Sequence, residues 1–138
     1  MMGSHTRVLV VDDDAGIRET LCVMLREDGY EVYEATNGFE ALQWMYTTTE
    51  PMVTLLDMWM PHMSGEDTLL TALEQDALWN RLSFIIITAN PQRISSRVRA
   101  IIEQHAIPLL TKPFDINVVA ELVEMRANAL AQIHMRHA

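Results

Sequence analysis

The chain has 138 residues, of which 49% are hydrophobic and 21% charged, a balance typical of one globular domain. Its formal net charge of −9 disfavours direct binding to DNA or RNA. Cys22 is the only cysteine, which excludes an intramolecular disulfide and a four-cysteine metal site. No apolar run has the length of a membrane span and no signal peptide is evident, so a cytoplasmic location is expected.

Apolar strands alternate with amphipathic helices from the start of the chain. A nearly continuous β-branched run at 7–11 predicts a strand covered on both faces, as in a parallel sheet. The next segment has helical spacing, and Gly29 is expected to end that helix. A short alternating strand follows at 31–35. Asn37 is then expected to cap a second helix, whose core face comprises Ala41, Leu42 and Met45.

The same alternation continues to the end of the chain. Three further apolar runs predict strands at 52–56, 84–87 and 107–110. Core positions of the intervening helices are Leu69, Leu70 and Leu73, then Ile94, Val98, Ile101 and Ile102. Asp115 is expected to cap a long last helix that runs to about Met135. Five strand–helix units predict an α/β fold with a parallel sheet and helices on both faces.

Unusual polar residues occur where predicted strands end. They are Asp12 and Asp13 after the first strand, Asp57 after the third, Thr88 after the fourth and Lys112 after the fifth. The carboxyl ends of parallel strands share one edge of an open sheet, so these side chains are expected to meet in one cleft. Asp14 is expected to cap the first helix rather than to bind metal. Taken alone, the Asp12-Asp13 pair would be an ordinary solvated turn.

Such a cluster has a definite chemistry. Neighbouring carboxylates repel one another, and a hard cation with oxygen ligands, most often Mg²⁺, relieves that repulsion. Together with the Lys112 ammonium and the Thr88 hydroxyl, the cation would be complementary to phosphoryl oxygens. One carboxylate remains as a nucleophile that can form an acyl phosphate. The sequence therefore predicts phosphoryl transfer to an aspartate.

Five segments resemble the receiver domains of bacterial two-component response regulators. They are Val-Leu-Val-Val-Asp-Asp-Asp at 8–14, Asn-Gly-Phe-Glu-Ala-Leu at 37–42, Leu-Leu-Asp-Met-Trp-Met-Pro-His-Met-Ser-Gly at 55–65, Ile-Ile-Ile-Thr-Ala at 85–89 and Leu-Thr-Lys-Pro-Phe-Asp at 110–115. The resemblance covers essentially all of residues 7–126. It implies a flavodoxin-like, doubly wound (βα)5 fold with strand order 2-1-3-4-5.

The resemblance also implies roles for individual residues. Asp57 would be the phosphoacceptor, with Lys112 pairing with it or with its phosphate and Thr88 moving to hydrogen-bond the phosphoryl group. Mg²⁺ would be held by Asp12, Asp13, Asp57 and the backbone carbonyl of Trp59. Four further positions would modulate the site: Ala89 leaves room for the threonine, Asn90 tunes phosphate lifetime, Leu109 occupies the position of a switch residue, and Pro113 follows a peptide bond that is often cis.

Leu109 and the stretch between Thr88 and Lys112 depart from the family pattern, and Trp59 leaves two interpretations open. Leu109 stands where receivers usually carry an aromatic switch residue, so the signal is expected to leave through the loop and the fourth helix instead. The longer stretch between Thr88 and Lys112 predicts an irregular fourth helix. Trp59 either shields the phosphoryl group from water, which would slow dephosphorylation, or lies on the surface without kinetic effect.

The resemblance implies a phosphoacceptor switch that catalyses only its own phosphorylation and dephosphorylation. Its partner would be a sensor histidine kinase or a phosphotransfer protein, and a homodimer would use the surface of the fourth helix, fifth strand and last helix. Two alternatives are a degenerate receiver that binds proteins without phosphorylation, and a small Mg²⁺-dependent aspartyl-phosphate hydrolase. The absence of a G-x-x-x-x-G-K loop argues against a kinase.

The sequence also predicts a domain organisation. Residues 1–6 are interpreted as a cloning remnant or a disordered N-terminus, 7–128 as the receiver domain, and 129–138 as an extension of the last helix. That extension predicts a continuation into an effector or kinase domain, although a stand-alone regulator is the other interpretation.

Overall fold

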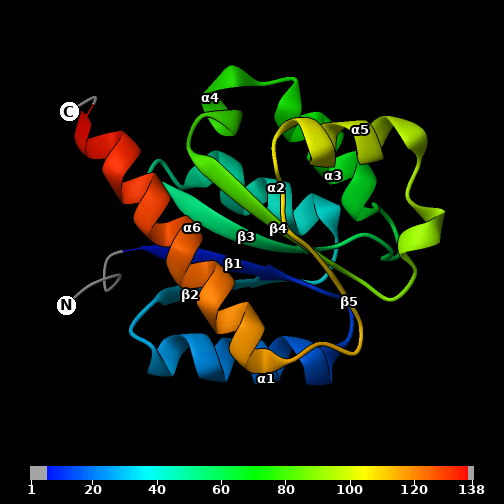
Figure 1. The fold of residues 1–138 in the computed structure, drawn as a ribbon, viewed down its shortest axis with the longest axis horizontal. Coiled ribbons are helices and arrows are strands. Elements are labelled where there is room, and N and C mark those ends of the chain that lie inside the picture. The colour runs from blue at the N-terminus through cyan, green and yellow to red at the C-terminus, as the bar shows by residue number, and fades with distance from the viewer. Residues whose placement is uncertain (1–5, 137–138) are drawn as a thin grey trace.

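The computed structural model describes residues 6–136, and for side chains residues 6–133. Five parallel strands form one sheet with the order β2-β1-β3-β4-β5 (Figure 1). The strands are β1 (Arg7–Val11), β2 (Glu31–Ala35), β3 (Met52–Asp57), β4 (Leu82–Thr88) and β5 (Leu109–Thr111). The predicted α/β class and strand order are therefore confirmed.

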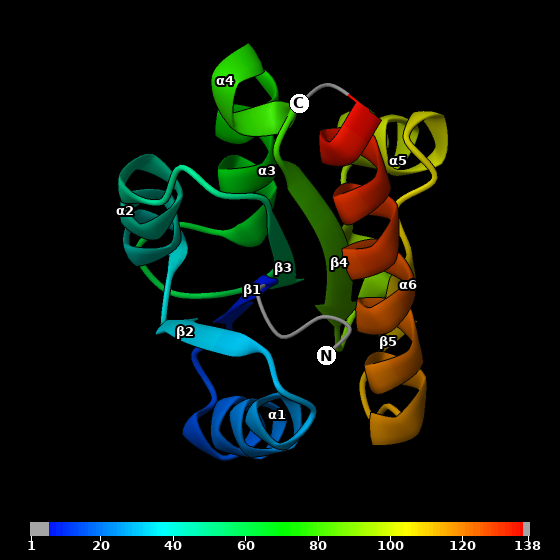
Figure 2. The same ribbon diagram turned by 90° about the vertical axis from the view of Figure 1, so that its left-hand side faces the viewer.

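Helices lie on both faces of this sheet (Figure 2). Along the chain they are α1 (Ala15–Glu27), α2 (Gly38–Thr47), α3 (Gly65–Leu73), α4 (Asp76–Trp79), α5 (Ser96–Gln104) and α6 (Ile116–Arg136), with a 3₁₀ turn, η1 (Pro91–Arg93), before α5. None of the helices in the described part of the chain combines the length and apolar character that crossing a membrane requires.

The alternation of side chains along each strand divides the core into two layers. Val8 and Val10 of β1 pack in one layer beneath α1 and α6, while Leu9 and Val11 pack in the other beneath α2, α3 and α5. All six residues of β3 are buried, as expected for a central parallel strand. The buried Cys22 lies in the α1–α6 layer, where burial raises the pKa of its thiol to about 11, so the thiol is unreactive.

The helix boundaries follow the predicted caps. The side chains of Asp14 and Asn37 accept hydrogen bonds from the backbone N–H groups of Ile17 and Glu40, respectively. Asp115 accepts from the N–H of Asn117 at the start of α6, over 2.8 Å. Gly29 follows α1 with a positive φ of 94°, which favours glycine. Asp14 is therefore a helix cap, as the sequence predicts.

Several elements differ from the sequence-based prediction, among them β4, which spans Leu82–Thr88 rather than 84–87. The fifth strand is Leu109–Thr111 rather than 107–110, because Pro108 has no N–H and its carbonyl accepts from β4 at the start of the pairing. Ile94 lies outside α5, at the end of η1, because Pro91 and the Ser95 cap divide the segment into two short helical pieces. The single turn of α4 has no periodicity and was not predicted. The predicted irregularity of the fourth helix corresponds to η1.

Candidate phosphorylation site

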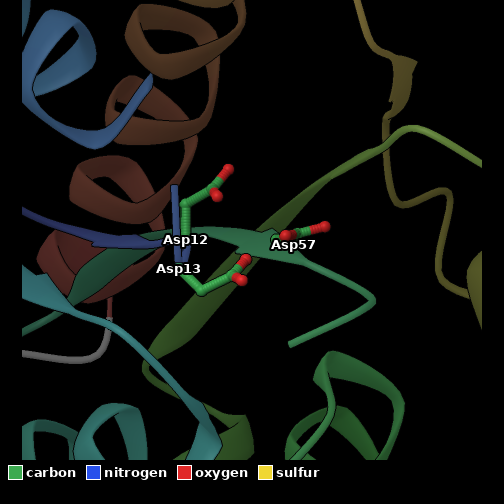
Figure 3. A group of neighbouring side chains, drawn as sticks. All are labelled: Asp12, Asp13 and Asp57. Atoms are coloured by element: carbon green, nitrogen blue, oxygen red, sulfur yellow. The ribbon is translucent and has the colours of Figure 1, made fainter. Parts of the chain in front are cut away.

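The register of the sheet brings the acidic residues together. Val11 of β1 pairs with Leu56 of β3, so the residues that follow them, Asp12 and Asp57, lie side by side at the carboxyl edge. Asp13 follows on the same turn, and the three side chains extend from these neighbouring strand ends (Figure 3). One carboxylate oxygen from each of the three lies within 4.8 Å of the other two. The expected convergence of the acidic residues is therefore confirmed.

Burial makes this arrangement electrostatically costly without a cation. Asp12 and Asp57 are 3% and 4% exposed, whereas Asp13 is exposed. Desolvation, followed by the negative charge of Asp12, raises the pKa of Asp57 to about 6, even though Lys112 and the Trp59 N–H act in the opposite direction. A carboxylate with this pKa is still mostly ionised above pH 7. It can act as a nucleophile there.

Lys112 supplies the one ammonium group among these carboxylates. Its Nζ lies 2.8 Å from Asp12 Oδ2 and 3.4 Å from Asp57 Oδ2. Burial lowers the pKa of Lys112, but its hydrogen bonds to Asp12 and Asp57 and their charges outweigh that effect, so the net shift is upward. The lysine therefore stays charged. It is held in place by the backbone, because its N–H donates to the Thr88 carbonyl over 2.8 Å.

Thr88 ends β4 one residue beyond Ile87, the register partner of Asp57. It is fully buried, and its Oγ1 accepts a hydrogen bond from the Asn90 N–H over 3.2 Å. Ala89, between Thr88 and Asn90, is small and exposed. The Thr88 hydroxyl therefore lies at the end of β4, the strand next to β3, which carries Asp57.

The loop after β3 shapes the other wall of the site. Trp59 is half-buried against the core, and its indole Nε1 donates to the Asn90 carbonyl over 3.3 Å. Its backbone N–H faces Asp57 Oδ1 at 3.4 Å. The indole therefore makes specific contacts and is not a free surface side chain. Whether it slows dephosphorylation stays a prediction.

The two remaining predicted positions lie on the β5 side. Leu109 pairs with Ile86 of β4 and packs, half-buried, against the core layer beneath α2, α3 and α5. The Lys112–Pro113 peptide bond is cis, as the resemblance implies.

The structure adds residues that the sequence did not single out for the site. Arg18 of α1 donates from Nη1 to the carbonyl of Asp12 over 2.9 Å and so fixes the first acidic turn. Arg93 places its guanidinium 4.5 Å from the centre of the Trp59 ring. A Cβ at Gly65 would overlap the carbonyl oxygen of Asp57, which explains the glycine at the start of α3. Only the glycine has a signal in the sequence, its place at the end of the loop motif.

The donor set suits a hard divalent cation. Three carboxylates against one ammonium leave two negative charges uncompensated when all are ionised, and all potential ligands are oxygens. Mg²⁺ has this preference and accepts few carboxylates. The acidic cluster therefore suggests Mg²⁺ binding, which is compatible with both burial and charge.

An open parallel sheet with acidic residues, a lysine and a hydroxyl at its carboxyl edge defines the class of α/β phosphoacceptor modules. The family model described as the response regulator receiver domain matches residues 8–124. The chain belongs to this family, and it has a phosphoacceptor role in two-component signalling.

The chain is similar to a bacterial phosphotransferase and to a bacterial transcriptional regulatory protein. It is 32% identical over 120 residues to sporulation initiation phosphotransferase F of Bacillus subtilis (strain 168), covering 87% of this chain and 92% of that relative. It is 33% identical over 129 residues to the transcriptional regulatory protein PdtaR of Mycobacterium tuberculosis (strain ATCC 25618 / H37Rv), covering 92% of this chain but 59% of that relative. The similarity therefore spans nearly all of one relative and only part of the other.

Among solved structures, the response regulator TrrA of Thermotoga maritima in complex with Mg²⁺ and BeF is 32% identical to this chain. The superposition has a TM-score of 0.66 and covers 87% of this chain and 97% of TrrA. That protein carries both the metal ion and a phosphoryl mimic.

Proposed function

We propose that Asp57 is the phosphoacceptor and that it takes its phosphoryl group from a phosphohistidine on a sensor histidine kinase or a phosphotransfer protein. The observation that carries this proposal is the contact of the Lys112 ammonium with both Asp12 and Asp57 at a buried strand end. Among the three acidic residues, Asp57 is central in the sheet and has the raised pKa of about 6.

The reaction is a transfer between two nucleophiles. An oxygen of the Asp57 carboxylate attacks phosphorus, the phosphorus–nitrogen bond of the donor breaks, and its electron pair returns to the donor imidazole. Lys112 remains beside Asp57 and neutralises charge on the transferred oxygens. The Thr88 hydroxyl, one strand away, turns to donate to one of those oxygens. The domain thereby catalyses its own phosphorylation and is not a turnover enzyme.

We propose Mg²⁺ as the cofactor, held by the carboxylates of Asp12, Asp13 and Asp57 and by the backbone carbonyl of Trp59. The bound ion would neutralise the acidic cluster and stabilise charge on the phosphoryl oxygens. Asp12 is already held by two backbone contacts, because its Oδ1 accepts from the Asp14 N–H at 2.9 Å and its carbonyl accepts from Arg18. This support fixes the orientation of the ligand before metal binds.

We propose that phosphorylation changes the conformation of the loop after β4, and that this change is what a partner detects. Ala89 gives the Thr88 hydroxyl room to move, and Asn90, which donates to that hydroxyl, follows it. Leu109 has no ring or hydroxyl that could report the movement through β5. Structures with and without a phosphoryl mimic would therefore differ in residues 89–105, and an unchanged segment would contradict this route.

The partner kinase is proposed to dock beside the site on α1. That helix exposes Val23, half of whose surface is accessible, next to an open groove formed with Ile116 at the start of α6. Acidic Glu19 and Glu27 flank this apolar strip. Such a surface fits an amphipathic helix with basic residues beside its apolar face. We also propose a cytoplasmic location.

We further propose that residues 7–128 form the receiver domain and that α6 beyond residue 128 is an extension of it; residues 1–5 and 137–138 of the expected terminal segments lie outside the described residues. A homodimer through α5, β5 and α6 is supported by the unpaired outer edge of β5 and by exposed Val118 and Met125 on α6. Sedimentation of the phosphorylated and unphosphorylated protein tests this state.

One experiment separates the proposal from its two alternatives. The protein is incubated with a small phosphodonor and Mg²⁺, and its intact mass is followed alongside an Asp57→Ala variant. One phosphate that is absent in the variant supports the proposal. No added mass supports a degenerate receiver, whereas continuous release of inorganic phosphate supports a hydrolase. Addition that persists in the variant contradicts the assignment of Asp57.

A further inference from the structure

Two loops flank Asp57, one after β3 and one after β4, and Trp59 joins them. The Trp59 backbone N–H faces Asp57 Oδ1 at 3.4 Å, and its indole Nε1 donates to the Asn90 carbonyl at 3.3 Å. The Asn90 N–H in turn donates to Thr88 Oγ1 at 3.2 Å. A chain of three hydrogen bonds therefore runs from the acceptor carboxylate to the hydroxyl that would contact its phosphate.

Arg93, which is exposed, contacts both Trp59 and Asn90. Its guanidinium lies 4.5 Å from the centre of the Trp59 ring, and its backbone N–H donates to the Asn90 carbonyl at 3.1 Å. The Asn90 carbonyl thus accepts from the tryptophan and from the arginine together. A guanidinium over an indole is attracted by the negative face of the ring, which restrains both side chains.

We infer that Trp59 and Arg93 form a clasp that holds the Thr88 hydroxyl in its unphosphorylated position, acting through Asn90; this inference rests on the proposed role of Asp57. A threonine hydroxyl has one donor hydrogen and two acceptor lone pairs. The hydroxyl could donate to a phosphoryl group in place, but rotation of the Thr88 side chain toward that group would move Oγ1, and the bond from the Asn90 N–H would then lengthen or break. An Asn90 backbone fixed by the clasp resists that change. Arg93 is a positioning residue.

The clasp is close in sequence to the start of α5. Arg93 ends η1, and two residues later the Ser95 side chain caps α5 by accepting from the Val98 N–H at 3.2 Å. The Ser95 N–H also donates a hydrogen bond to Glu66 Oε2 of α3 over 2.6 Å. Movement of Asn90 is therefore transmitted through η1 to the start of α5, a route that does not involve Leu109.

The test compares Arg93→Ala with Arg97→Ala, a control that removes an exposed arginine from the same region. Arg97 is exposed, in the first turn of α5. In the metal-free protein, the Asn90 amide is expected to exchange hydrogen about two- to fivefold faster in Arg93→Ala than in the control, because one cation–π contact is lost. Arg93→Lys, which keeps the charge without the planar stack, is expected to fall between them.

The second readout is the affinity for beryllofluoride in the presence of Mg²⁺. Arg93→Ala is expected to bind about two- to fivefold more tightly, because the resting position of Thr88 is less favoured. Trp59→Leu is expected to have a similar effect, and the double variant no more than either single variant, since both changes open one clasp.

Equal behaviour of Arg93→Ala and Arg97→Ala, weaker binding by Arg93→Ala, or additive effects of the two single variants would overturn the inference. Each of these results leaves the proposed function intact. Failure of the wild-type protein to bind Mg²⁺ and beryllofluoride would instead refute the proposed role of Asp57, and the clasp with it.

Discussion

The buried charge of Asp57 is predicted to destabilise the metal-free fold. Its pKa is about 6 in the folded protein against 3.8 in the unfolded chain, because burial and the charge of Asp12 disfavour ionisation. A carboxyl whose pKa is raised by folding stabilises the fold only while protonated. Its contribution is therefore fully present below about pH 3.8 and is lost as the pH rises through about 6.

The size of the effect follows from that shift. About two pKa units correspond to roughly 3 kcal/mol, and the shift already includes the opposing attraction of Lys112. Asp57→Asn removes the charge with little change in shape, and Lys112 keeps Asp12 as a partner at 2.8 Å. At neutral pH without metal, the variant is expected to be more stable by about 2–3 kcal/mol.

Urea unfolding in the presence of a chelator measures this difference between pH 4 and pH 8. The gain of Asp57→Asn is expected to grow with pH through about 6, and saturating Mg²⁺ is expected to stabilise the wild type more than the variant. Glu121→Gln, an exposed change on α6, controls for the loss of one negative charge. A gain that is independent of pH, or equal to that of the control, would refute the reasoning.

Three further changes test the site. Lys112→Met is expected to slow phosphorylation of Asp57 by a small phosphodonor about 100-fold, measured by intact mass, since one preorganised cation is lost; a rate within twofold of wild type would contradict this. Trp59→Ala is expected to accelerate phosphate loss if the indole excludes water, and no acceleration refutes the shielding hypothesis. Gly65→Ala is expected to lower the free energy of unfolding by about 2 kcal/mol, because its Cβ would overlap the Asp57 carbonyl, whereas Gly16→Ala on α1 has more space and is expected to cost less.

Residues that carry local signals were placed correctly from the sequence. The β-branched run of β1 predicts a strand, and Asp14 and Asn37 predict helix starts, from only a few neighbouring residues in each case. The convergence of Asp12 and Asp57 was also predictable, because parallel strands place their carboxyl ends on one edge whatever the register. These features depend on the chain's own periodicity and on a general rule of topology.

The parts that were missed depend on contacts between distant segments. Arg93 has no neighbour in sequence that marks it, since its partner Trp59 lies in the loop after another strand. The start of β5 at Leu109 rather than at position 107 reflects pairing with β4, which an apolar run alone does not specify. Such details are set by side-chain geometry and register, and no periodicity in the sequence encodes them.

The buried carboxylate and the loop contacts would act on two successive steps, phosphorylation and the movement that follows it. Burial and the charge of Asp12 raise the pKa of Asp57, and a cation at the acidic cluster would oppose this shift, so metal binding would favour the ionised carboxylate without requiring any movement of Thr88. The proposed movement of Thr88 would then have to overcome the hydrogen bond from Asn90, whose carbonyl accepts from Trp59 and lies beside the Arg93–Trp59 contact. In this proposal, charge at the strand ends would control readiness for phosphorylation, whereas the loop contacts would control the response to it. Changes at Asp13 should therefore alter metal affinity and, through it, phosphorylation, whereas changes at Arg93 should leave metal affinity unchanged and alter the movement of Thr88.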